Sequence, residues 1–190
     1  MNDNQQQPAE VQILDKRFRR SYPNARIQAD IRRMAQRLNR DYQEQPGPPP
    51  LVICLLNGVF MFAADLLKRL RFPCEVSFVK FASYQGTTST GTVNQLIGLN
   101  ASVRGRTVIV LDDIIETGAT LQAIYDLLQP QQPKEFRVGA LLFKPDCYRG
   151  QLPIDYVGRR IPNDFIVGYG LDYNGLGRNL PDIYTLIPTI

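Results

Sequence analysis

Thr107-Val-Ile-Val-Leu-Asp-Asp-Ile-Ile-Glu-Thr-Gly-Ala-Thr-Leu121 is the stretch of this sequence that determines its fold class. Residues 108–111 are apolar, as in a strand that is buried on both faces of a sheet. Two adjacent acids follow, and a loop of small residues leads into the helical stripe Leu121, Ile124, Tyr125 and Leu128. Ligands of open parallel sheets bind beyond the carboxyl ends of the strands, so this junction is a candidate binding site.

The loop at 116–120, Glu-Thr-Gly-Ala-Thr, has the composition of a phosphate-binding site. A helix N-terminus offers free backbone N–H groups and the positive end of the helix dipole, and two threonine hydroxyls add donors. Asp112 and Asp113 can accept hydrogen bonds from a sugar diol or hold magnesium through water. The alternative is a helix that is capped by Thr117 and has exposed acids at its start. The acids favour a functional interpretation, because adjacent carboxylates repel unless a cation or diol compensates them.

Strand-like and helix-like segments alternate along most of the chain. We expect strands at 51–56, 76–81 and 138–143, short strands at 156–158, 165–169 and 183–186, and helices over 27–38, 60–67 and 121–128. The breaker stretch at 45–50, Gln-Pro-Gly-Pro-Pro-Pro, ends the first helix. This alternation predicts an α/β fold with a mostly parallel sheet flanked by helices on both faces.

Length and composition limit the domain count and the available chemistry. A chain of 190 residues is most simply one domain. We expect residues 1–24 to be a partly disordered N-terminal tail and residues 25–190 to form the domain. The sequence contains no histidine, which excludes a Ser-His-Asp triad, a Cys-His pair and a His-liganded zinc site. Acid–base work therefore falls to carboxylates, lysine or tyrosine. The formal net charge of +4 is compatible with an anionic substrate.

Sequence signals for targeting point to the cytoplasm. No apolar run approaches the roughly 18 residues of a membrane span, and the N-terminus lacks the features of a signal peptide. The three cysteines are scattered and form no C-x-x-C pair, which fits a reducing compartment. We therefore expect a cytoplasmic protein without a membrane partner.

The stretch at 107–121 resembles the phosphoribosyl pyrophosphate motif of type I phosphoribosyltransferases: an apolar strand, two acids, two apolar residues, an acid and Thr-Gly-x-Thr. Other segments are similar to the hypoxanthine-guanine branch of this family. They are its pyrophosphate loop and following helix at 55–66, its mobile active-site loop at 83–91, and its base-binding hood within 156–181. The similarity runs from about residue 27 to the end in the same order, whereas the first two dozen residues do not match.

The resemblance implies a type I phosphoribosyltransferase fold with a small hood subdomain. It also implies purine salvage, in which the phosphoribosyl group of phosphoribosyl pyrophosphate passes to hypoxanthine or guanine, with magnesium as cofactor. By resemblance, the residues that bind phosphoribosyl pyrophosphate are Asn57, Gly58, Ser83, Tyr84, Asp112, Asp113, Thr117, Gly118, Ala119, Thr120 and Arg178. Members of the family are usually dimers or tetramers, so we expect the same here.

The resemblance further implies a role for each residue around the base and the metal. Lys144 donates to the purine 6-oxygen, Phe165 stacks on the base, and the Ile166 carbonyl reads its other edge. Asp172 lies near the base and, with Asp112 and Asp113, holds magnesium. Glu116 is then the general base that takes the purine proton, which is a task for a carboxylate in a chain without histidine.

Three positions depart from the family pattern. Glu116 stands where the family usually has aspartate, which moves the carboxylate by up to about 1.5 Å. Ala119 and Asn57 replace lysines of some relatives.

Two alternative functions stay open at this point. Glu116 and the basic clusters at 16–20 and 159–160 are compatible with a non-catalytic, RNA-binding regulator of the same fold. A preference for xanthine is the second alternative. Because the hood residues for a purine are present, we favour the enzyme and do not expect a nucleic-acid partner.

Overall fold

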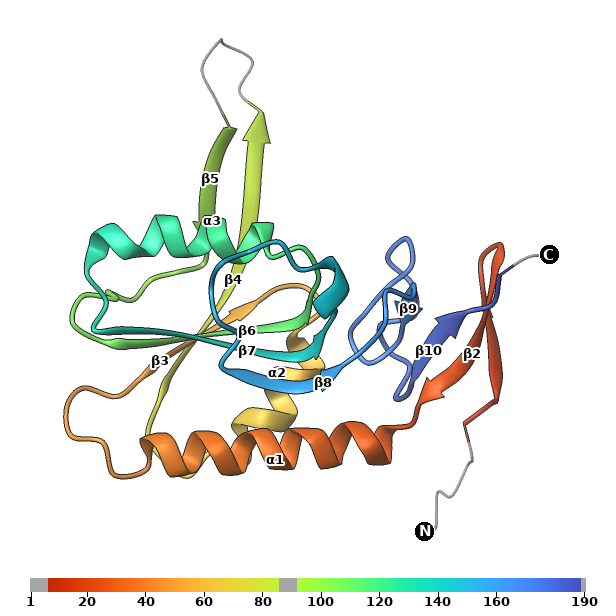
Figure 1. The fold of residues 1–190 in the computed structure, drawn as a ribbon, viewed down its shortest axis with the longest axis horizontal. Helices are drawn as coiled ribbons and strands as arrows, with labels where there is room; N and C mark the ends of the chain where they lie inside the picture. The colour runs from red at the N-terminus through yellow and green to blue at the C-terminus, as the bar shows by residue number, and fades with distance from the viewer. Residues whose placement is uncertain (1–6, 86–91, 189–190) are drawn as a thin grey trace.

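The main sheet has six strands and is mostly parallel (Figure 1). The computed structural model describes residues 7–85 and 92–188, and it describes only the backbone of 81–85 and 92–97. In spatial order the strands are β5 (Thr92–Ile97), β4 (Glu75–Gln85), β3 (Leu51–Leu55), β6 (Thr107–Ile115), β7 (Glu135–Phe143) and β8 (Tyr156–Arg160). Only β5 runs antiparallel to its neighbour.

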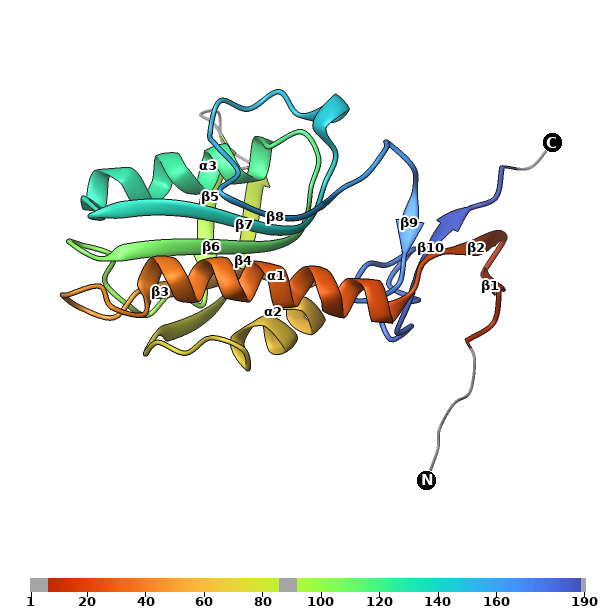
Figure 2. The same cartoon turned by 60° about the horizontal axis from the view of Figure 1, so that its bottom comes forward.

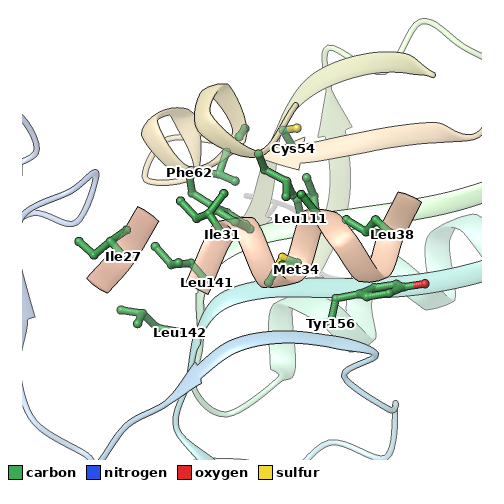
Figure 3. Close-up of a cluster of buried hydrophobic side chains, with 14 of the residues drawn as sticks. Ile27, Ile31, Met34, Leu38, Cys54, Phe62, Leu111, Leu141, Leu142 and Tyr156 are labelled. Carbon is green, nitrogen blue, oxygen red and sulfur yellow. The ribbon is translucent and has the colours of Figure 1, made fainter. Parts of the chain in front are cut away.

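Helices cover both faces of this sheet (Figure 2). The helices α1 (Asn24–Tyr42) and α2 (Phe60–Leu67) lie on one face, and α3 (Ala119–Leu128) lies on the other. The stripe Ile27, Ile31, Met34 and Leu38 of α1 packs with Phe62 of α2 against alternate strand residues such as Cys54 and Leu111 (Figure 3). The intervening strand residues, such as Ile53 and Val110, pack against Leu121 and Ile124 of α3. The predicted α/β fold is therefore confirmed.

A second, antiparallel sheet forms the hood. Its strands lie in the order β1 (Glu10–Ile13), β2 (Lys16–Tyr22), β10 (Ile183–Leu186) and β9 (Ile166–Val167). The hood lies beyond the carboxyl ends of β6, β7 and β8 (Figures 1 and 2). It joins the main body where the backbone N–H of Asn24, at the start of α1, donates to Asp182 Oδ1 at 2.7 Å.

Several element boundaries differ from the expectations. The segment 1–24, expected to be a partly disordered tail, contains the strands β1 and β2. Strand β6 continues through the acidic pair to Ile115, because its pairing with β7 extends to Phe143. Strand β9 ends at Val167 rather than at residue 169, because the backbone turns at Gly168, where φ is +103°. Two short 3-10 helices, η1 (Gln129–Gln131) and η2 (Pro145–Cys147), complete the described elements. None of the helices in the described part of the chain is long and apolar enough to span a bilayer.

Candidate active site

The acidic pair lies near the carboxyl end of β6, a central strand of the main sheet. Asp112 Oδ1 accepts a hydrogen bond from the Asp113 N–H at 3.0 Å, and Asp113 Oδ1 accepts one from the Ile114 N–H at 3.0 Å. Burial raises the pKa of both carboxyls, and the charge of Asp113 raises that of Asp112 further. The guanidinium of Arg178 acts in the opposite direction on the pKa of Asp113. A cation or a diol at this position would relieve the remaining repulsion.

The loop between β3 and α2, residues 56–59, lies directly against this pair; we call it the Gly58 loop. A Cβ atom on Gly58 would lie 1.7 Å from Asp113 Oδ2, so any larger residue here would displace the Asp113 carboxylate. The neighbouring Asn57 is exposed, and the Leu56–Asn57 peptide bond is cis. The structure thus brings together the two segments that the sequence analysis assigned to pyrophosphate and to ribose.

The Gly118 loop, residues 116–120, connects β6 to α3. Its central glycine has φ +84°, and a Cβ there would lie 2.4 Å from the Tyr148 ring. The Ala119 N–H donates to Thr117 Oγ1 at 3.3 Å, while Thr117, Ala119 and Thr120 are exposed. This loop, with Asp112, lines a cavity of about 180 Å³. The loop therefore presents a helix start and two threonines to a concave space, as a phosphate site requires.

Lys144 and Glu116 form an ion pair across the ends of β7 and β6. The lysine side chain is 5% exposed and the glutamate side chain 51% exposed. The backbone supports the contact, because the Lys144 N–H donates to the Ile115 carbonyl at 3.0 Å. Sequence analysis assigned these two residues separately to the base and did not predict their pairing. Together they place a donor and an acceptor side by side next to the Gly118 loop.

The hood contributes Arg178 and Asp172 on one segment, residues 168–178, which we call the hood segment. Arg178 Nη2 lies 2.6 Å from Asp172 Oδ1, and Arg178 Nη1 donates to the Gly170 carbonyl at 2.7 Å. A Cβ on Gly170 would lie 2.0 Å from the Gly58 carbonyl oxygen. The Gly58 loop is therefore enclosed between Asp113 on one side and the hood segment on the other.

The predicted base-contact residues Phe165 and Ile166 lie within the hood. The Phe165 ring is 46% exposed and packs against Phe18 and Tyr173, with ring centroids 6.2 and 5.8 Å apart. Ile166 pairs with Thr185 of β10. In the described part of the chain, no hydrogen bond or ion pair joins Phe165 or Ile166 to the Lys144–Glu116 pair. Phe165 and Ile166 therefore lie in the hood, whereas Lys144 and Glu116 follow β7 and β6 of the main sheet.

Part of the predicted site lies outside the described residues. Ser83 and Tyr84 belong to β4, where their backbones pair with Asn94 and Val93, but their side chains are not described. Residues 86–91 of the predicted mobile loop are not described either. The described residues contain no group of three or more cysteines, histidines or carboxylates that could hold a metal on its own.

Sequence reasoning missed several tertiary contacts around the site, including those that join the hood to the main body. Tyr169 of the hood segment donates to Asp65 of α2 at 2.6 Å, and Gln28 of α1 also contacts Asp65 at 2.6 Å. Tyr148 packs against Gly118 from the segment after η2. Each contact joins residues far apart in the sequence, so no local pattern signals it.

Comparisons with known proteins agree with this architecture. Residues 22–174 match the model of the phosphoribosyl transferase domain family. A hypoxanthine-guanine phosphoribosyltransferase of Staphylococcus aureus is 39% identical over 165 residues, which are 86% of this chain and 90% of the relative. The crystal structure of a hypoxanthine phosphoribosyltransferase from S. aureus aligns with a TM-score of 0.79 at 36% identity, over 89% of this chain and 91% of that one. A hypoxanthine-guanine phosphoribosyltransferase structure from Bacillus anthracis aligns with a TM-score of 0.77 at 32% identity, over 88% and 96%.

Proposed function

Because this chain belongs to the hypoxanthine-guanine phosphoribosyltransferase family, we propose that its active site is the region enclosed by β6, the Gly58 loop, the Gly118 loop and the hood. The chain is an enzyme of purine salvage that transfers the phosphoribosyl group of phosphoribosyl pyrophosphate to hypoxanthine or guanine. The relatives compared above do not favour an RNA-binding regulator or a xanthine-preferring enzyme.

The observation that carries the assignment of the base is the Lys144–Glu116 pair beside the Gly118 loop. A 6-oxopurine offers a carbonyl oxygen next to the ring nitrogen that must lose its proton. The Lys144 ammonium, which only donates, suits the oxygen, and the Glu116 carboxylate suits the N–H. As the base enters, we infer that both side chains turn from each other to it, with Glu116 taking the proton. Phe165 then stacks on the base, and the Ile166 carbonyl meets its other edge.

The sugar and phosphates are assigned to the remaining residues. We infer that Asp112 and Asp113 accept hydrogen bonds from the ribose hydroxyls, and that Thr117, Gly118, Ala119 and Thr120 surround the 5′-phosphate. Asn57 and Gly58 meet the pyrophosphate through backbone groups, while Arg178 adds positive charge as the pyrophosphate departs. Ser83 and Tyr84 are assigned to phosphoribosyl pyrophosphate on the resemblance alone.

The carboxylates of this site suit magnesium, which prefers oxygen ligands and keeps several of its waters. Burial raises the pKa of Asp112 and Asp113, and the charge of Asp113 raises that of Asp112 further, so a nearby cation would stabilise their ionised forms. Both Asp172 oxygens have partners, in Arg178 and the Gly175 N–H, but each keeps a lone pair for a magnesium-bound water. When bound, magnesium would neutralise charge on the pyrophosphate.

We also propose a cellular compartment, an oligomeric state and domain bounds for this enzyme. The free thiols Cys54, Cys74 and Cys147 support a reducing cytoplasm. The exposed side chains Phe60 and Phe78, on α2 and β4, support a homodimer or homotetramer. We take residues 25–190 as the phosphoribosyltransferase domain with its hood, to which β1 and β2 add the outer strands.

The test is a panel of bases assayed with phosphoribosyl pyrophosphate and magnesium. We expect nucleotide from hypoxanthine or guanine and none from adenine, whose 6-amino group would face the Lys144 donor. A mismatched buried polar group can cost as much as ~10⁴-fold in discrimination. Adenine turnover comparable to that of hypoxanthine would contradict the role of Lys144, and turnover of xanthine alone would revive that alternative.

A further inference from the structure

The hood segment is attached to α2 through one buried tyrosine. Tyr169 is 1% exposed, and its hydroxyl donates to Asp65 Oδ2 at 2.6 Å. Gln28 supports the contact, since its Nε2 lies 2.6 Å from Asp65 Oδ2 and 3.3 Å from the Tyr169 oxygen. Arg69 in turn donates to Gln28 Oε1 at 2.8 Å. The phenol therefore joins the hood segment to two other elements, α1 and α2.

The charge states of the two partners make this a strong contact. Burial works to raise the pKa of Asp65, but hydrogen bonds from Lys68, Tyr169 and Gln28 outweigh it and lower that pKa. Burial, and then the neighbouring Asp65 carboxylate, raise the pKa of Tyr169. The phenol therefore stays protonated and donates to an ionised carboxylate. Hydrogen bonds with one charged partner are roughly twice as strong as neutral ones.

The backbone at Tyr169 is held in a conformation that it would not adopt unaided. Its φ is +50°, in the left-handed region that a bulky residue rarely occupies. It lies between Gly168 and Gly170, whose φ values are +103° and +99°. The Tyr169 N–H also donates to the Leu180 carbonyl at 2.7 Å. Such strained residues persist where the surroundings over-determine them, and they cluster at functional sites.

The position of Tyr169 in the chain links this contact to pyrophosphate. Its neighbour Gly170 lies directly on the Gly58 carbonyl, and the Gly170 carbonyl accepts the hydrogen bond from Arg178. The partner Asp65 belongs to α2, which begins directly after the Gly58 loop. The Tyr169–Asp65 bond therefore joins the two elements that carry the groups around the pyrophosphate.

We propose that Tyr169 is a positioning residue for pyrophosphate: anchored by Asp65, it holds the hood segment against the Gly58 loop so that Arg178 faces the departing group. This inference rests on the proposed function. The residue touches no substrate in this scheme and acts through Gly170 and Arg178. Its loss should therefore weaken binding of phosphoribosyl pyrophosphate selectively, because Lys144 and Glu116, which we assign to the base, lie on other elements.

Tyr169→Phe is the decisive variant, because it keeps the buried ring and removes only the hydroxyl. We expect the KM for phosphoribosyl pyrophosphate to rise about tenfold, which corresponds to about 1.4 kcal/mol. The KM for hypoxanthine should stay within about twofold, because the proposed donor and acceptor for the base, Lys144 and Glu116, lie outside the hood segment. Calorimetry with phosphoribosyl pyrophosphate and magnesium should show the same weakening in the dissociation constant.

Tyr184→Phe is the matched control. Tyr184 is also a buried hood tyrosine, and its hydroxyl donates to the Pro8 carbonyl at 3.2 Å, away from the Gly58 loop. We expect both KM values to be unchanged in this variant. Asp65→Asn should weaken phosphoribosyl pyrophosphate binding in the same direction as Tyr169→Phe. The double variant should then lose less than the sum of the single effects, as contacting residues do.

The dissociation constants of Tyr169→Phe and Tyr184→Phe test the proposal directly. An unchanged dissociation constant in Tyr169→Phe, or an equal weakening in Tyr184→Phe, would overturn it. A wild-type enzyme that forms no nucleotide from hypoxanthine or guanine would overturn the proposed function instead. The calorimetric comparison of the two variants would still decide the role of Tyr169.

Discussion

Glu116 serves two purposes at the residue scale, since it neutralises the buried Lys144 ammonium and, in our proposal, removes the purine proton. We expect Glu116→Gln to lower kcat by about 10²–10⁴-fold, the usual contribution of a general base. The binding of phosphoribosyl pyrophosphate should change little, because the phosphate contacts that we propose come from backbone N–H groups and threonines that remain. Steady-state kinetics and calorimetry separate the two effects, and an unchanged kcat would refute the role of Glu116 as base.

Glu116→Asp tests whether this site is adapted to the longer side chain. The aspartate carboxylate would be withdrawn by up to about 1.5 Å, away from Lys144. A displacement of that size can cost about 100-fold in rate, so we expect a lower kcat despite the return of the family's usual residue. A kcat equal to or above that of the wild type would show that the glutamate is a handicap.

We expect the buried carboxyls of Asp112 and Asp113, which serve the proposed function, to lower the folding stability of the enzyme. Their pKa values are raised in the folded state, so the unfolded chain loses these protons first as the pH rises. Folding stability therefore falls from about pH 3.9, the unfolded value, up to the folded pKa. We expect Asp112→Asn to raise Tm at pH 8, by about 2–4 °C for each kcal/mol of desolvation cost and repulsion relieved.

The pH dependence and a control variant test this explanation. The gain of Asp112→Asn should shrink as the pH falls toward 4, because the raised pKa of Asp112 keeps that carboxyl protonated there, and catalysis should be lost at every pH. Asp126→Asn replaces an exposed aspartate on α3 and should leave Tm unchanged. Calorimetric scans that show a lower Tm for Asp112→Asn at pH 8 would contradict the explanation.

At the scale of elements, the β1–β2 hairpin completes the hood core. Phe18 is fully buried with Ile13, Val167 and Tyr184, and its ring also supports Phe165. We expect Phe18→Ala to lower the free energy of unfolding by about 3–5 kcal/mol, as for a large buried aromatic. The KM for hypoxanthine should rise as well, because the proposed stacking ring loses its support.

Leu14→Ala is the control for this prediction, since Leu14 lies between the same two strands but is 52% exposed. Its effect on the free energy of unfolding should be within about 0.5 kcal/mol. Urea denaturation measures both variants. If Phe18→Ala cost no more than Leu14→Ala, the hairpin would be a dispensable addition to the hood.

These elements also show what the sequence could predict. The central strands β3 and β6 were predictable because a fully apolar run signals burial on both faces, and the stripe of α1 signals one buried face. The β1–β2 hairpin was not predictable from the sequence. In β2, single apolar residues stand between arginines, and the strand pairs with β10, which lies more than a hundred residues away. The motif at 107–121 predicted that the acidic pair and the Gly118 loop lie next to each other. The Lys144–Glu116 and Tyr169–Asp65 contacts, in contrast, depend on tertiary packing.

At the scale of the whole molecule, the proposed substrate site spans the main sheet and the hood. Asp112, Asp113 and the Gly118 loop belong to the sheet, whereas Asp172 and Arg178 belong to the hood. The contacts that join the two parts include the Asn24–Asp182 hydrogen bond, the Tyr169–Asp65 hydrogen bond and the Gly170–Gly58 contact. A ligand that bridges both parts should therefore stabilise the molecule as a unit.

We expect phosphoribosyl pyrophosphate with magnesium to raise Tm by about 5–10 °C at a concentration of 100 times its dissociation constant. Binding at that concentration contributes about 2.7 kcal/mol, and each kcal/mol raises Tm by about 2–4 °C for a chain of this size. The shift should shrink as the pH falls through the raised pKa values of Asp112 and Asp113, because a protonated carboxyl no longer attracts a cation or accepts from a diol as strongly. It should also shrink when EDTA removes magnesium, and Asp112→Asn should show little shift at any pH. A full shift in Asp112→Asn would mean that the acidic pair is not part of the binding site, whatever the phosphates contact elsewhere.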